Sequence, residues 1–97
     1  MRLFYFYFLL FINHLSSAQS YQGIVKDSET NEAIPNVTIY FANSSSGTTS
    51  NMDGTFSLTR PEGLNTALIF RALSYEILNT YNFENTNLGT VFLKPKL

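Results

Sequence analysis

The sequence predicts an all-β domain, a sandwich of seven short strands, preceded by a cleaved signal peptide. After about residue 20, apolar and polar residues alternate in short runs, as they do in strands with one buried face. Turn-forming residues interrupt these runs about every eight to twelve residues, a spacing typical of β-sandwiches. No firm cap opens a helix after the N-terminal segment. These three observations favour paired sheets over an alternating strand–helix layout.

Residues 1–18 are expected to be a secretory signal peptide that is removed after Ala18. Arg2 precedes an apolar run over residues 3–12, which is well short of the roughly 20 residues that a membrane-spanning helix needs. The alternative, a retained anchor, would place His14 and Ser16 in hydrocarbon. No cysteine stands at the cut, so the usual bacterial lipid anchor is excluded.

The expected mature chain spans residues 19–97 and has room for one small domain only. Once Arg2 is removed, five basic residues face seven acidic ones, so no basic stripe is available for nucleic acid. The chain contains no cysteine, so no disulfide supports the small core. We therefore expect marginal stability or support from a partner.

The first two strands are predicted over residues 21–27 and 37–42, where β-branched and aromatic residues alternate with polar ones. The connection between them, residues 28–36, contains Pro35 and many turn formers, and it should deliver Ile34 as an apolar plug near the end of the domain. The residues expected on the inner face of these strands are Tyr21, Gly23, Val25, Val37, Ile39 and Phe41.

A polar loop over residues 43–46 is followed by a predicted hairpin over residues 47–59, which supplies strands three and four. Its turn is Asp53-Gly54, because this pair offers a residue at positive φ and a local side-chain hydrogen bond. Phe56 and Leu58 alternate with polar residues and should face the core.

Three further strands are predicted, over residues 67–73, over residues 75–81, and from Thr90 until Pro95 ends the last one. A reversal at residues 60–63 precedes them, and an Asn-rich loop at 82–89 separates the last two. A helix over residues 64–78 is the main alternative, because the run has some 3.6-residue periodicity. Strand-favouring residues and the missing cap argue against that helix.

Several spaced motifs occur in a fixed order: G-x-V-x-D from Gly23, EAIPNVTI over residues 32–39, GTTS over 47–50, D-G-x-F-x-L over 53–58, and LIF with Ser74-Tyr75 beyond it. In this order the chain resembles the carboxypeptidase-regulatory-like domain, from Tyr21 to about Pro95. The resemblance implies a seven-stranded Greek-key sandwich of the transthyretin-like, immunoglobulin-like kind. Such domains are frequent in envelope proteins of Bacteroidetes-type bacteria, often at the N-terminus of TonB-dependent outer-membrane receptors.

The matched residues suit a scaffold, since they are glycines, a proline, turn residues and core apolar residues rather than reagents. They are Gly23, Val25, Asp27, Pro35, Val37, Ile39, Gly47, Asp53, Gly54, Phe56, Leu58, Phe70 and Tyr75. Three positions depart from the family pattern, because Asn31, Asn36 and Ser74 stand where glycine is usual. Asparagine tolerates a left-handed conformation, whereas serine is less suited to it.

Reaction chemistry is poorly represented in the expected mature chain. The only histidine, His14, lies in the expected signal peptide, and there is no cysteine. A Ser-His-Asp or Cys-His site and a zinc site of usual composition are therefore excluded. Transthyretin-like folds include a hydrolase of the urate pathway whose site resembles a His and Arg constellation, which this chain cannot reproduce. We expect no enzymatic activity, no cofactor and no metal site.

Carboxylates offer weaker candidates for chemistry. Asp27, Glu29 and Glu32 fall on one loop, and a calcium site is conceivable, but the alternating ligand spacing is missing. A turn is the favoured reading of this loop and of residues 51–53. A pair of carboxylates for glycoside hydrolysis has no sequence feature that brings two of them together. The candidates for such a pair are Asp53, Glu62, Glu76 and Glu84.

Aromatic side chains are the remaining candidates for binding, by stacking on sugars or anchoring a protein contact. They are Tyr40, Tyr75, Tyr81, Phe83 and Phe92, and packing within the domain is their simpler role. Asn36 and Asn43 begin glycosylation triplets that recur by chance in an Asn-rich and Ser-rich chain. Residues 94–96, Lys-Pro-Lys, resemble edge protection against sheet aggregation.

We therefore expect a non-enzymatic, exported module that mediates structural or protein–protein interactions in the bacterial envelope. Its location would be the periplasm, the outer-membrane surface or the medium, with no transmembrane span after signal cleavage and no nucleic-acid partner. One alternative is a small glycan- or peptide-binding protein, with Tyr40, Tyr75 and Tyr81 on one surface. Another is the N-terminal piece of a TonB-dependent receptor standing alone.

Overall fold

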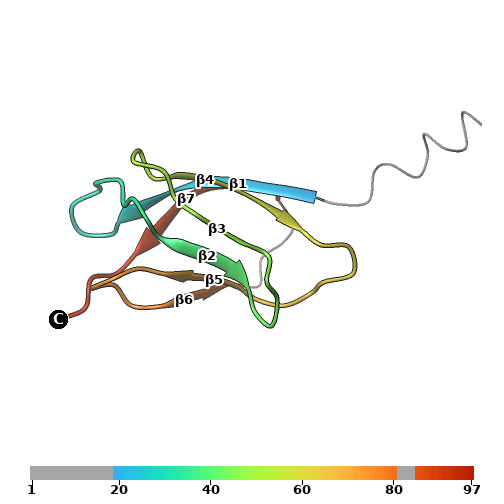
Figure 1. Cartoon of the computed structure of the whole chain (residues 1–97). Helices are drawn as coiled ribbons and strands as arrows, with labels where there is room; N and C mark the ends of the chain where they lie inside the picture. The colour runs from blue at the N-terminus through green and yellow to red at the C-terminus, as the bar shows by residue number, and fades with distance from the viewer. Residues whose placement is uncertain (1–18, 81–84) are drawn as a thin grey trace, which may run out of the picture.

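The computed structural model describes residues 19–80 and 85–97, which contain seven strands and no helix (Figure 1). The expected signal peptide lies outside the described residues. The strands are β1 (Gln19–Asp27), β2 (Thr38–Phe41), β3 (Gly47–Thr49), β4 (Thr55–Arg60), β5 (Leu68–Arg71), β6 (Leu78–Thr80) and β7 (Asn87–Leu93). The all-β prediction is confirmed, and the alternative helix over residues 64–78 is wrong, because this stretch forms β5, turns and the start of β6.

The strands form two sheets that face each other (Figure 1). One has three strands in the order β4-β1-β7, and the other has four in the order β3-β2-β5-β6. β1 pairs antiparallel with β4 and parallel with β7, with a register shift between Gln22 and Ile24, while all pairs in the second sheet are antiparallel. The molecule is therefore a β-sandwich in which the long first strand is central to one sheet.

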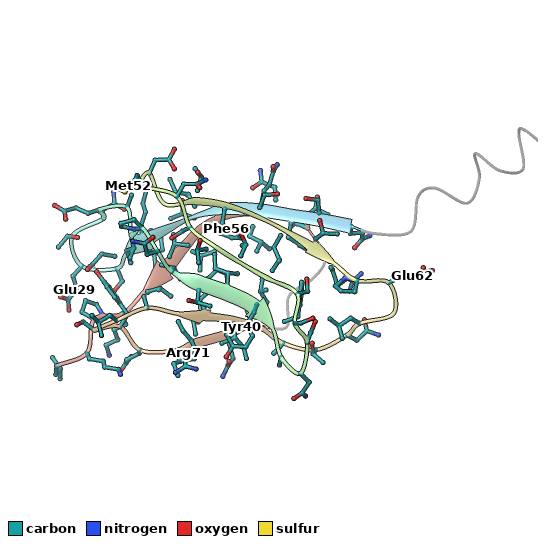
Figure 2. All side chains as sticks on the ribbon, viewed as in Figure 1. Glu29, Tyr40, Met52, Phe56, Glu62 and Arg71 are labelled. Atoms are coloured by element: carbon teal, nitrogen blue, oxygen red, sulfur yellow. The ribbon has the colours of Figure 1, made fainter. Side chains whose placement is uncertain are left out.

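The core fills the space between the sheets with alternate residues from each strand, as the side-chain period of two requires. Tyr21 from β1 meets Phe41 from β2 edge to face, with ring centroids 6.2 Å apart. Phe56 from β4 meets Phe70 from β5 in the same way at 5.6 Å, and Figure 2 shows Phe56 between the layers. Each such ring contributes about 1.5–3 kcal/mol by burial. The other buried core residues are Val25, Ile34, Val37, Ile39, Leu58, Leu68 and Leu93.

The predicted hairpin over residues 47–59 is wrong in its pairing, although its turn is present. The Gly54 amide donates to the Asn51 carbonyl at 2.9 Å, so the chain does reverse at Asp53-Gly54. However, β3 pairs with β2, and β4 pairs with β1 in the other sheet. The local turn signal and the alternation of β4 suit either sheet. The long-range partners decide the pairing. β4 satisfies the backbone hydrogen-bonding groups of β1, and β3 satisfies those of β2.

Residues 50–54, here called the crossover, carry the chain from one sheet to the other and are bonded to both. The Ser50 hydroxyl, buried in the interior, accepts from the Val37 amide at 2.9 Å and donates to the Ile34 carbonyl at 2.8 Å. At the other end, the Gly54 carbonyl accepts from the Val25 amide at 2.8 Å. The amide of Ile34 donates to the Val25 carbonyl at 3.0 Å, so the apolar plug is held beside β1 next to the crossover.

The bounds of the last three strands differ most from the sequence prediction. The expected strand 75–81 is reduced to β6, because Ser74 has a φ of 69° and breaks the extended chain before Tyr75. β5 is likewise shorter than residues 67–73, and β7 begins at Asn87, inside the expected loop 82–89.

The expected edge protection at residues 94–96 is also corrected, because this segment is paired with residues 74–76. The Glu76 amide donates to the Lys94 carbonyl at 2.8 Å, and the Lys96 amide donates to the Ser74 carbonyl at 2.9 Å. The end of the chain thus leaves β7 and runs beside the second sheet, with an isolated bridge between Tyr75 and Pro95.

Replacing Gly54 by alanine should unfold the domain far more readily than the same change at Gly63. Both glycines have positive φ, 82° and 79°, but a Cβ on Gly54 would lie 2.6 Å from the Val25 carbonyl, whereas one on Gly63 meets nothing within 4 Å. We expect a loss of about 3 kcal/mol for Gly54→Ala and about 1 kcal/mol for Gly63→Ala in the free energy of unfolding by urea. Equal losses at the two positions would contradict the tight contact of the crossover with β1.

Candidate binding groove

A groove of about 490 Å³ lies on the outer face of the four-stranded sheet, away from the core. The residues that give it chemical character are Tyr40, Arg71, Leu73, Tyr75, Ile77 and Lys96. Figure 2 labels Tyr40 and Arg71 on this outer side of the sheet, with Phe56 on the inner side. Its volume falls within the range of about 300–1,000 Å³ that is typical of ligand pockets.

The alternation of β2 and β5 places Tyr40 and Arg71 on the outer face. Their neighbours in sequence, Phe41 and Phe70, are fully buried, so Tyr40 and Arg71 must point the other way. Arg71 lies opposite Thr38 in the register of the two strands. Tyr40 is therefore its diagonal neighbour, at a spacing that long side chains can bridge.

Two apolar side chains, Leu73 and Ile77, project into solvent at the groove, 93% and 53% exposed. They flank a tight turn in which the Tyr75 amide donates to the Ala72 carbonyl at 3.2 Å. Ser74 adopts a left-handed conformation there, which costs a residue with a Cβ about 1–2 kcal/mol. The backbone bonds to Lys94 and Lys96 hold this turn from the other side, so the exposed residues sit on an anchored segment.

Tyr75 is fixed by a hydrogen bond to the loop after β1. Its hydroxyl donates to Oδ2 of Asp27 at 2.7 Å, while Oδ1 of Asp27 accepts from the amides of Glu29 at 2.7 Å and Thr30 at 3.0 Å. These hydrogen bonds hold the pKa of Asp27 below its ordinary value of 3.8, and the bond from Tyr75 has the largest effect, followed by those from the two amides. The same hydrogen bond, burial, and the charges of Asp27 and Glu32 raise the pKa of Tyr75.

Two of the carboxylates considered from sequence, Asp27 and Asp53, accept hydrogen bonds within local turns. Both carboxylate oxygens of Asp27 accept the hydrogen bonds just described. Asp53 accepts from the hydroxyl and the amide of Thr55, and these two hydrogen bonds lower the pKa of Asp53. Within residues 19–80 and 85–97, no three acidic or histidine side chains gather in a way that could hold a metal ion. Glu62 lies at the other end of the sandwich from the crossover (Figure 2), and Glu84 is outside the described residues.

Of the aromatic candidates, Tyr40 and Tyr75 share the groove. Phe92 lies on β7 in the other sheet and is half exposed. Tyr81 and Phe83 fall outside the described residues.

The scaffold motifs lie around the crossover and the core. Val25, Val37, Ile39, Phe56, Leu58 and Phe70 are buried, and Gly47 opens β3. A Cβ on Gly23 would come within 2.9 Å of the Gly89 carbonyl and 3.0 Å of the Phe56 ring, so only glycine fits there. Pro35 follows Ile34, whose carbonyl accepts a hydrogen bond from the Ser50 hydroxyl.

The three departures from the family pattern all have positive φ. The angles are 63° at Asn31, 60° at Asn36 and 69° at Ser74. Asparagine adopts this region more readily than most residues, so the first two are mild replacements for glycine. Ser74 is the strained one, and it forms the turn that exposes Leu73.

Sequence reasoning missed several residues that the groove and the crossover use. Alternation along residues 67–73 indicates that Arg71 and Leu73 share a face, but nothing in the sequence shows that Ile77 and Lys96 join them. The signal that could have found the groove is the Ser74 position itself, because an unusual residue at a glycine site marks an anchored turn. Ser50 was part of a motif, yet its buried hydroxyl could not be inferred without its partners.

Replacing Tyr75 by phenylalanine should destabilise the domain by about 1 kcal/mol at neutral pH, because the Asp27 carboxylate loses a donor. Since the pKa of Asp27 is lowered in the folded state, this contribution is fully present above pH 3.8 and is lost as the pH falls through the folded pKa. The two stability curves, measured by urea unfolding, should therefore converge in acid. Tyr40→Phe is the matched control with little effect, and a constant difference between Tyr75→Phe and wild type down to low pH would contradict this account.

The comparisons with known proteins agree with this architecture. Among residues 19–80 and 85–97, no helix has the length and apolar character needed to cross a membrane. No curated protein matches the chain. The family model of the CarboxypepD_reg-like domain matches residues 21–96, which is most of the chain. The protein therefore belongs to the CarboxypepD_reg-like domain family.

Proposed function

We propose that this chain is an exported, non-enzymatic β-sandwich module that binds a protein partner in the bacterial envelope through the groove on its four-stranded sheet. The observation that carries the proposal is the anchored pair of exposed apolar residues, Leu73 and Ile77, beside Tyr40 and Tyr75. Exposed aliphatic side chains on a rigid turn bury apolar area on contact at little cost in ordering. Such a surface suits a protein interface with a central apolar contact.

Export is supported by the N-terminal pattern of Arg2, an apolar run and small residues before Ala18. The site of action would then be the periplasm, the outer-membrane surface or the medium. The absence of histidine and cysteine after residue 18 supports a binding role over acyl transfer or zinc chemistry. Domains of this family are regulatory, non-catalytic modules, which points the same way.

A small glycan is the second candidate ligand, because Tyr40 and Tyr75 line the same groove and tyrosine rings stack on sugar faces. The family resemblance also supports a third role, that of a receptor's N-terminal piece acting alone. The protein partner ranks first since Leu73 and Ile77 offer aliphatic surface, which sugars match poorly.

The proposal is tested by crosslinking in cells of its own host, followed by recovery of the tagged chain from the envelope fraction. Wild type should recover a defined envelope protein, and the double variant Leu73→Ser, Ile77→Ser should lose it. Met52→Ser is the matched control, because Met52 is 84% exposed but lies at the turn near the other sheet (Figure 2). Recovery of the same proteins by all three chains would overturn the groove as the binding surface. A glycan that quenches tyrosine fluorescence equally in wild type and in the Leu73→Ser, Ile77→Ser variant would favour the second candidate.

A further inference from the structure

Two cationic side chains, Arg71 and Lys96, line the groove. Arg71 lies at the end of β5 and Lys96 lies near the end of the chain, and both side chains are exposed. Within residues 19–80 and 85–97, neither side chain forms an ion pair or a hydrogen bond with another side chain. Among the described residues, no carboxylate lines the groove.

This local charge runs against that of the chain as a whole. The formal net charge is −1, and beyond residue 18 seven acidic residues outnumber five basic ones. Two of those five cations nevertheless flank one groove. An unpaired cation beside exposed apolar surface favours a partner that brings a carboxylate together with apolar side chains, since like charge at the same place would be repelled.

The geometry of the groove places the two features side by side. Arg71 reaches the groove from β5 and is the diagonal neighbour of Tyr40, while Lys96 arrives on the segment that is bonded to the Ser74 turn. Leu73 and Ile77 flank that turn in sequence and line the same groove. An extended segment lying in the groove would therefore meet aliphatic contacts and both cations together.

Building on the proposed function, we infer that the groove binds an acidic peptide segment, one with apolar side chains for Leu73 and Ile77 and carboxylates for Arg71 and Lys96. Opposite charge speeds encounter and fixes orientation, while the apolar contacts supply most of the affinity. Exposed ion pairs are screened by salt, so binding should weaken as ionic strength rises.

The test uses a displayed library of random twelve-residue peptides, selected on the immobilised full chain at low salt. Enriched peptides should have a net negative charge and apolar residues. Their affinity, measured by fluorescence polarisation, should fall about twofold to fivefold in Arg71→Gln and in Lys96→Gln. Lys26→Gln, which removes the same charge from β1 in the other sheet, should leave affinity unchanged. Raising NaCl from about 0.05 M to about 0.5 M should weaken binding to the wild type.

The outcomes separate this inference from the proposed function. Neutral or basic peptides that depend on Leu73 and Ile77 but not on Arg71 would overturn the acidic specificity and leave the groove as a binding surface. Selected peptides that bind the Leu73→Ser, Ile77→Ser variant as well as wild type, or a selection that enriches nothing, would overturn both. Circular dichroism of each variant establishes that a loss of affinity is not a loss of fold.

Discussion

The hydrogen bonds of the crossover hold the two sheets of this sandwich in place. Ser50 joins it to the start of β2 through Val37, and Gly54 joins it to β1 through Val25. Both ends lie in the interior, where an unmet backbone or hydroxyl group costs about 1–3 kcal/mol. In a chain without a disulfide, these buried polar contacts add to the apolar packing in fixing the relative position of the two layers.

The position of the groove depends on these hydrogen bonds of the crossover. Once β2 is held at its start, its alternation sends Ile39 into the core and Tyr40 outward, and β5 follows in register with Arg71 on the same side. The Asp27 loop leaves β1 at the same end and fixes Tyr75 through its hydroxyl. The strained Ser74 turn then has rigid neighbours on both sides. The binding surface is thus built from long-range contacts, although each of its residues lies on a short local element.

The sequence predicts which residues face the core of the sandwich, but it does not predict which strands pair in each sheet. Alternation placed Val25, Ile39 and Phe56 inside because a period of two leaves one buried face. It could not tell that β3 and β4 belong to different sheets, since a turn signal such as Asp53-Gly54 specifies a reversal and not a partner. Lys96 joins the groove because the end of the chain pairs with residues 74–76, far away in sequence, and no local pattern reports such a contact.

If its hydrogen bonds hold the sheets together, the crossover should open only when the whole domain unfolds. Native-state hydrogen exchange tests it most directly, because the amide of Val25 reports the bond to Gly54 and the amide of Val37 reports the bond to Ser50. We expect both amides to exchange with the same opening free energy as the best-protected amides paired within β2 and β5. Exchange of Val25 and Val37 about a hundredfold faster, with those strand amides still protected, would show that the sheets stay together without the crossover.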